Sequence, residues 1–263
     1  MEDRLQWIRL NPKRWVDWAP VNGGLKAHSL LRQRYANAQV NVIEPTRQRQ
    51  ALARAALGGN WLQRLVMQGP SFEVPEAGSA DMLWANMALH TSANPQALLQ
   101  QWYQLLAVDG FVMFSCLGPD TCKELQAVYQ AQGWTPPAHT FTDMHDWGDM
   151  LVEAGFAEPV MDMERITLTY ETPERMLQDL RGLGRNLHTE RFARLRGKAW
   201  RTQLLQALAS TARTTADGRL VLTIEVIYGH ALKPTPRFKV AAESTVSLQD
   251  LRASLQKNKT PGV

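Results

Sequence analysis

The chain opens with a pattern that few folds accommodate: two short apolar strands separated by a glycine-bearing turn and a helix. The first strand spans residues 15–18, the turn holds Gly23, a helical run follows through residues 30–34, and the second strand covers residues 40–43. This order predicts a βαβ unit with two parallel strands. A carboxylate at the tip of the second strand of such a unit accepts hydrogen bonds from ribose hydroxyls, and Glu44 stands there.

Short apolar runs continue to alternate with helical patterns, which predicts a mostly parallel sheet. Asn94 followed by Pro95 marks the start of one helix. The strands are expected at residues 64–68, 81–86 and 111–115, and the helices at residues 47–57 and 95–106.

Beyond residue 118 the pattern changes. Helices are expected at residues 120–132, at residues 142–154 with Gly155 as C-cap, and at residues 173–208 with breaks at Gly182 and Gly184; strands are expected at residues 161–170 and 220–230. The sequence thus predicts an α/β fold with a seven-stranded doubly wound, Rossmann-like sheet. We expect one domain over residues 1–232, a lid-like helical insertion at residues 172–212 and a disordered tail at residues 233–263.

Polar residues stand at or near the ends of four expected strands. They are Asp17, Glu44, Asn86 and Ser115. In doubly wound sheets ligands bind beyond the carboxyl ends of the strands, so these residues predict one cleft.

Composition excludes several functions. The 263 residues include no apolar run that approaches a membrane span, and the first residues lack a signal peptide's apolar segment, so a cytoplasmic protein without membrane contact is expected. Cys116 and Cys122 match no metal or redox spacing, and no metal site is expected. They are expected to be reduced thiols.

The net charge of +4 is concentrated in one segment. Residues 181–201 carry seven basic residues against Glu190 alone: Arg181, Arg185, Arg191, Arg194, Arg196, Lys198 and Arg201. Nothing there resembles a nucleic-acid platform, so no nucleic-acid partner is expected. Two alternatives stay open: a solvated helix face, or a docking patch for an acidic protein.

Several segments together resemble class I S-adenosylmethionine-dependent methyltransferases, and within them the malonyl-[acyl-carrier-protein] O-methyltransferases of biotin synthesis. The resemblance covers roughly residues 5–232 and rests on residues 81–90, 114–121, 143–149, 151–156, 161–170 and 225–230. It implies methyl transfer from S-adenosyl-L-methionine to the free carboxylate of a malonyl thioester on an acyl carrier protein.

The resemblance also implies site residues. Asp17, Gly23, Glu44 and Asn86 would bind the cofactor. No catalytic base is implied, because a carboxylate is already nucleophilic at neutral pH and positioning carries most of the rate. A cation would orient that carboxylate; Arg181 and Arg185 are the candidates, with Arg165 a weaker one. Tyr228 and His230, at the end of the last strand, could line the substrate side of the cleft or pack in the core. His90 and His145 are expected to be structural hydrogen-bonding residues.

The cofactor turn departs from the family pattern. Ala19 and Val21 stand where the family has glycines, and Pro20 removes an N–H. The acidic position after the third strand holds Pro70 or, with a one-residue gap, Ser71. The N-terminus is expected to be shortened, without the family's extra helix. Two functions therefore stay open: an O-methyltransferase, or a catalytically inactive methyltransferase-fold protein that binds an acyl carrier or a partner methyltransferase chain.

Overall fold

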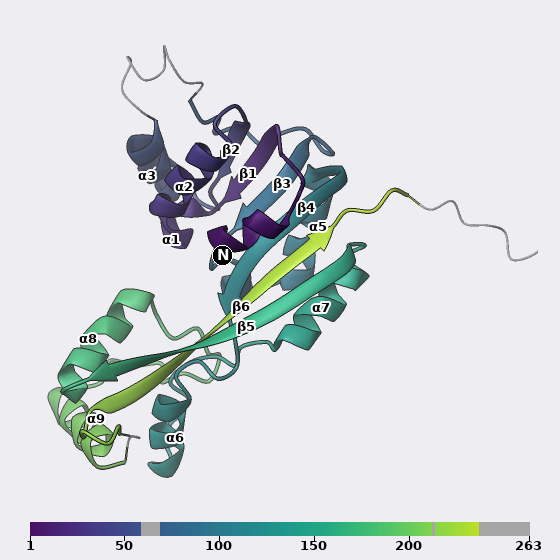
Figure 1. Ribbon diagram of the computed structural model, residues 1–263. Coiled ribbons are helices and arrows are strands. Elements are labelled where there is room, and N and C mark those ends of the chain that lie inside the picture. Colours follow the sequence, from purple (N-terminus) through teal and green to yellow (C-terminus); the bar gives the residue numbers. More distant parts are fainter. Residues whose placement is uncertain (59–68, 212–213, 237–263) are drawn as a thin grey trace, which may run out of the picture.

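The computed structural model describes residues 1–58, 69–211 and 214–236. Within them lies one mixed sheet of six strands in the order β2-β1-β3-β4-β6-β5 (Figure 1). The α/β class and the alternation of strands and helices are confirmed. The strand expected at residues 64–68 lies outside the described residues.

The helices and strands follow the chain in βα order up to β4. Their bounds are η1 Glu2–Trp7, β1 Arg14–Trp18, α1 Pro20–Gly23, α2 Leu25–Arg34, β2 Gln39–Ile43, α3 Arg47–Leu57, β3 Ala80–Ala85, η2 Leu89–Thr91, α5 Pro95–Leu105, β4 Leu106–Leu117, α6 Lys123–Ala131, α7 Met144–Glu153, β5 Ala157–Tyr170, α8 Pro173–Leu183, α9 Lys198–Thr211 and β6 Leu220–Leu232.

Strands β2, β1, β3 and β4 are parallel, because a crossover joins each to the next. Trp18 pairs with Ile43, and Asp17 pairs with Trp84 of β3. The carboxyl ends of these strands therefore meet at one edge, which we call the carboxyl edge. Asp17, Glu44, Asn86 and Ser115 all lie at or near this edge, as the order of strands predicts, and their binding roles stay predictions.

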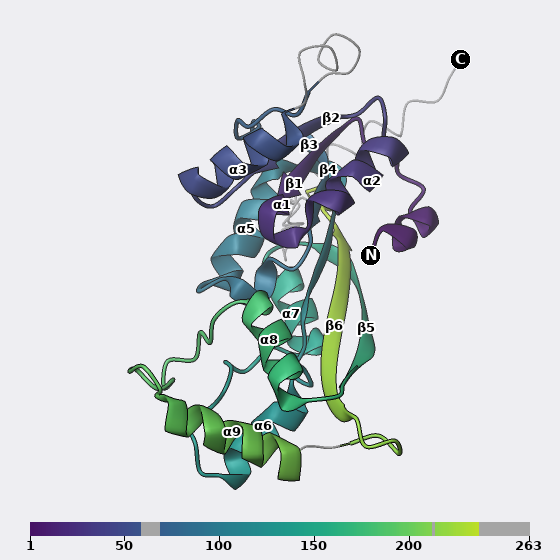
Figure 2. The same cartoon turned by 90° about the vertical axis from the view of Figure 1, so that its left-hand side faces the viewer.

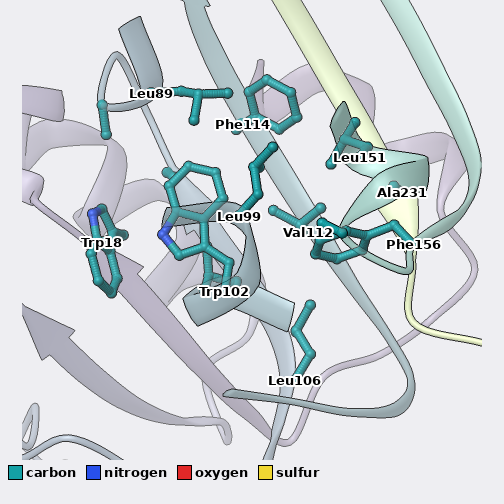
Figure 3. Close-up of a cluster of buried hydrophobic side chains, with 14 of the residues drawn as sticks. Trp18, Leu89, Leu99, Trp102, Leu106, Val112, Phe114, Leu151, Phe156 and Ala231 are labelled. Atoms are coloured by element: carbon teal, nitrogen blue, oxygen red, sulfur yellow. The ribbon is translucent and has the colours of Figure 1, made fainter. Parts of the chain in front are cut away.

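Helices cover both faces of this parallel part. One buried cluster joins side chains of α5 and α7 to the sheet, among them Trp102, Leu99 and Leu151 (Figure 3). The other cluster joins Leu31 of α2 and Leu5 of η1 to the opposite face. In Figure 2 α2 and η1 lie on one side of the strands and α5 lies on the other. The sheet is thus the middle layer of three.

Strands β5 and β6 are antiparallel and longer than their neighbours, and they extend past the carboxyl edge to α6, α8 and α9 (Figures 1 and 2). A third buried cluster closes this end of the molecule. It includes Tyr170, Met176, Leu204, Leu208 and Leu222. The expected antiparallel edge strand is confirmed as β5, which begins at Ala157 rather than at residue 161.

Two chain segments differ in part from what the sequence predicts. In the region 173–208, α8 ends at Gly184 as predicted but continues through Gly182, and residues 184–197 separate it from α9. Most of the expected tail, residues 237–263, lies outside the described residues, but its first residue is held: the Lys233 N–H donates to Gly110 O (2.7 Å) and its Nζ donates to Leu106 O (2.7 Å). These bonds hold the chain against the start of β4.

Candidate functional site

Asp17 lies on β1 beneath the carboxyl edge and is almost fully buried. Its Oδ2 lies 2.7 Å from Nδ1 of His28, a buried residue of α2. Burial raises the pKa of the Asp17 carboxyl, and the His28 hydrogen bond opposes that rise. The carboxylate is therefore engaged inside the protein, where it ties β1 to α2.

The turn after β1 keeps a glycine-like backbone without the glycine. Ala19 has φ 54° and ψ 46°, the left-handed conformation that favours glycine. The short helix α1 follows, and the N–H groups of Gly23 and Gly24 donate to Ala19 O (3.0 Å) and Pro20 O (2.9 Å). The turn thus keeps the backbone conformation of a glycine at Ala19, and the N–H groups of Gly23 and Gly24 are bonded within the turn.

Glu44 follows β2 and reaches this turn. Its Oε1 accepts a hydrogen bond from the Val21 N–H (2.8 Å), whereas its Oε2 is buried and has no hydrogen-bond partner among the described residues. Burial raises the pKa of Glu44, the Val21 N–H and the Arg49 charge lower it, and the Asp17 charge raises it further. One acceptor oxygen therefore remains unused at the tip of β2.

Asn86 closes the turn from the other side. Its Nδ2 donates to Gly23 O, and its Oδ1 accepts from the Ser115 hydroxyl (2.6 Å). A Cβ on Gly23 would lie 2.6 Å from Asn86 O, so this position requires glycine for close approach. The turn after β1 thus brings Gly23 together with Glu44 from the end of β2 and Asn86 from the end of β3.

The two arginines predicted to orient the substrate belong to α8 and to the segment that follows it. Arg181 is in the last turn of α8 and Arg185 follows that helix; both are exposed. Helix α8 packs against β5 and α9. Arg165 on β5 is paired with Asp120 (Nε to Oδ2, 2.7 Å) and lies 3.7 Å from Glu225, so its charge is used within the protein.

Tyr228 and His230 lie within β6, near its end at Leu232. Because β6 is antiparallel to β4, its last residue, Leu232, pairs with Phe111 at the amino-terminal part of β4. The Tyr228 hydroxyl donates to Glu164 (3.3 Å), and the Arg4 guanidinium lies 4.2 Å from the ring centroid. The substrate role of Tyr228 stays a prediction; Tyr228 pairs with Ser115, whose hydroxyl donates to Asn86, so it lies level with the carboxyl edge.

His90 and His145 differ in their surroundings. His90 lies in η2, and its Nδ1 accepts from the Leu117 N–H (3.3 Å). Burial, with a smaller effect of His139, lowers the pKa of His90 to about 4. His145 is exposed in the first turn of α7. His90 is therefore a neutral hydrogen-bonding residue, as expected.

Sequence reasoning missed several buried polar residues, among them His28 and Glu225. His28 is three positions before buried Leu31, so the helical spacing of α2 was the available signal. Glu225 Oε2 accepts from the Asp120 N–H (2.7 Å), and Thr121 Oγ1 donates to Glu225 O (3.1 Å). Nothing in the local sequence marks that long-range partnership.

Two cavities in the described part of the chain lie elsewhere. One of about 800 Å³ is lined by residues 11–14 and 34–39, at the amino ends of β1 and β2. The other, about 310 Å³, is lined by Arg54, Gly58, Gly69, Pro70 and Phe72. Ser71 beside it extends the sheet through a parallel bridge to Asn41, with the Val42 N–H donating to Ser71 O (2.8 Å).

The described residues contain no group of His, Cys, Asp and Glu that could hold a metal ion. Cys116 and Cys122 are buried free thiols. Across the same residues, no helix combines the length and apolar character that a bilayer crossing needs.

A family model described as a methyltransferase domain matches residues 22–114, from the turn to β4. The chain is 39% identical over 246 residues to the malonyl-[acyl-carrier protein] O-methyltransferase of Laribacter hongkongensis, covering 90% of this chain and 81% of the relative. The protein of that name from Gallionella capsiferriformans is 38% identical, with 90% and 82% covered. The chain belongs to the malonyl-[acyl-carrier protein] O-methyltransferase family. The resemblance noted in the sequence is thereby confirmed.

Solved structures agree on the fold. A Bacillus halodurans protein that carries a methyltransferase name superposes with a TM-score of 0.60 at 17% identity, covering 89% of this chain and 99% of that one. The YcgJ protein of Bacillus subtilis gives a TM-score of 0.58 at 12% identity, with 89% and 97% covered. This chain therefore has the same fold as these two proteins.

Proposed function

We propose that the protein transfers a methyl group from S-adenosyl-L-methionine to the free carboxylate of a malonyl group carried by an acyl carrier protein. The observation that carries this proposal is the 39% identity to a protein of that name over 90% of the chain. The role in biotin synthesis that the sequence resemblance implies is part of the proposal.

The residues at the carboxyl edge fit the ribose part of the cofactor. Glu44 Oε2 is a buried acceptor without a partner in the described structure, and a ribose hydroxyl is a donor of suitable size and chemistry. Asn86 and Gly23 would shape the turn, and Asp17 would hold β1 against α2 beneath it. When bound, the cofactor supplies an electrophilic methyl group on a sulfonium sulfur.

The chain's own task is positioning. The acceptor carboxylate is ionised at neutral pH, so no residue has to remove a proton, and alignment with exclusion of water carries the rate. We propose that Arg181 or Arg185 orients this carboxylate, since a guanidinium binds a carboxylate in a bidentate manner. This assignment requires residues 172–212 to act as a lid, with α8 approaching the carboxyl edge when substrate is bound.

The proposed partner is the acyl carrier protein, and the proposed compartment is the cytoplasm. The internally bonded turn gives weight to the second candidate function, a methyltransferase-fold subunit that no longer binds the cofactor and instead supports a carrier or a partner methyltransferase chain. Ala19 and Val21 carry side chains where the family has glycines, and Pro20 lacks an N–H that could donate to a ligand. The two candidates differ in whether the cofactor binds.

Isothermal titration with S-adenosylhomocysteine tests the proposal. We expect binding in the micromolar range, together with methyl transfer to a malonyl thioester. Absence of heat at millimolar ligand, with the chain folded by circular dichroism, would exclude the enzyme and leave the non-binding subunit.

A further inference from the structure

Residues 184–197 join α8 to α9 without forming a helix, and we call them the basic connector. They carry four arginines and one glutamate: Arg185, Arg191, Arg194, Arg196 and Glu190. The sequence left open whether these charges lie on a solvated helix face. They do not, because this segment leaves the helix at Gly184 and re-enters it only at Lys198.

The basic connector is held in place at both ends. Asn186 Nδ2 donates to Pro136 O (2.8 Å), and Arg196 Nη2 donates to Thr135 Oγ1 (3.1 Å). The Arg196 guanidinium also lies 4.1 Å from the ring centroid of Trp200 on α9. These contacts fix a non-helical segment to the loop before α7, so its outward residues form a defined surface.

Three large apolar side chains point to solvent in the same segment. The exposed fractions are 54% for Leu187, 48% for Phe192 and 101% for Leu195. Neighbouring exposed apolar residues next to charges are typical of surfaces that a partner covers. A partner that covers these side chains would remove apolar surface from water, which is favourable.

The charges of the segment lack compensation. Arg191 donates to a backbone carbonyl, that of His188 (3.0 Å), rather than to a carboxylate. No ion pair joins Arg185 or Arg194 to an acidic residue within the part of the chain that the structure describes. The basic connector therefore presents net positive charge beside apolar side chains, which complements an acidic surface with apolar positions.

We infer that the basic connector, through Arg191, Arg194 and Leu195, is the docking surface for an acidic acyl carrier protein. This inference rests on the proposed function for the partner's identity and adds the surface that binds it. A second copy of this chain would bring like charges together. A nucleic acid would use stacking, but Arg196 already covers the Phe192 ring at 4.5 Å from its centroid.

Direct binding of holo-acyl carrier protein that carries no acyl group tests the surface without requiring methyl transfer. The test variant is Arg191→Glu with Arg194→Glu, and Leu195→Ser is a second, separate variant. The matched control is Arg9→Glu with Lys13→Glu, two exposed basic residues in the segment before β1. All these positions are exposed, so the variants should fold.

We expect the double reversal to weaken carrier binding at least about tenfold and the control to change it less than about twofold. Raising the salt from about 50 mM to about 300 mM should weaken the wild type more than the double reversal. Leu195→Ser should weaken binding without altering the salt dependence. With a carrier-free malonyl thioester, methyl transfer by the double reversal should match that of the wild type.

The outcomes separate the two proposals. Equal weakening by test and control variants, or no carrier binding by the wild type, overturns the docking surface even where methyl transfer proceeds. A single-stranded oligonucleotide that binds through the same arginines more tightly than the carrier also overturns it. Absence of S-adenosylhomocysteine binding overturns the enzymatic function, whereas carrier binding that depends on Arg191 and Arg194 would still support the surface.

Discussion

Glu44 and Glu124 are two shielded carboxylates whose oxygens are used differently. At Glu124, the first acidic residue of α6, Oε2 accepts from the Thr223 N–H (2.8 Å) and Oε1 accepts from the Thr223 hydroxyl (2.6 Å). At Glu44, one oxygen accepts from Val21 and the other has no partner within the described chain. A fully bonded carboxylate stabilises the scaffold, whereas a partly bonded one marks a position available to a ligand.

Replacing Glu124 with Ala tests the scaffold side of this comparison and should have the largest effect. The N–H and hydroxyl of buried Thr223 would both lose their acceptors, which should lower the free energy of unfolding by about 2–5 kcal/mol. Chemical denaturation measures this change. Glu153→Ala, at an exposed position of α7, should cost less than about 0.5 kcal/mol. Similar costs for the two variants would contradict the assigned bonds.

Acid should destabilise the carboxyl edge through His90. Its native pKa is about 4, below the ordinary 6.5, because burial and His139 disfavour the charged form. Between these two values the unfolded chain binds more protons than the native one, so stability falls as pH falls through this window. The full contribution is about 2–3 kcal/mol and is present above pH 6.5.

Denaturation midpoints measured from pH 7 to pH 4 check this loss. In His90→Gln, whose amide oxygen can still accept from the Leu117 N–H, the acid-induced loss should be smaller by that amount. His145→Gln, an exposed control, should leave the wild-type profile intact. A profile unchanged by the His90 substitution would mean that His90 titrates normally.

Much of the fold could be predicted because its signals are local. Asn94 caps α5 by accepting from the Ala97 N–H (3.0 Å), and Gly155 takes φ 99° after α7, both as the sequence indicates. Capping and left-handed positions depend on one or two side chains, so they can be read from adjacent residues. The convergence of Asp17 and Glu44 follows equally from the parallel order of βα units.

The rest depends on partners that are distant in sequence. Residues 184–197 contain good helix formers, yet Asn186 and Arg196 bond to residues about fifty to sixty positions earlier instead. Lys233 is held by the β4 region in the same way. The antiparallel direction of β6, which places Tyr228 opposite Ser115, is likewise set by pairing with β4. Tertiary contacts override local propensity at each of these places.

Replacing Glu44 with Gln tests the ligand side of the comparison. The amide oxygen can keep the Val21 hydrogen bond, but the free acceptor is lost. Affinity for S-adenosylhomocysteine should fall about tenfold or more, as expected for a lost hydrogen bond to a charged group. Titration calorimetry measures this, and unchanged affinity would place the ribose elsewhere.

The same substitution, which should weaken ligand binding, should increase the free energy of unfolding relative to the wild type as pH rises. Burial raises the native pKa of Glu44, so the native state holds the proton longer than the unfolded chain does and loses stability as pH rises through that window. Glu44→Gln does not titrate and should gain on the wild type as pH increases. A gain that shrinks towards neutral pH would contradict the raised pKa.

Ala19→Gly should give the smallest effect and the most specific one. In α3, Ala55→Gly should lower the free energy of unfolding by about 1 kcal/mol, because glycine loses more backbone entropy on folding. At Ala19 the left-handed conformation costs about 1–2 kcal/mol for a residue with a Cβ, which offsets that entropy. The net change should be between about zero and a 1 kcal/mol gain, measured by denaturation. A loss equal to that of Ala55→Gly would mean that the turn does not hold Ala19 in this conformation. The backbone of the turn that bonds Glu44 would then differ from the one described.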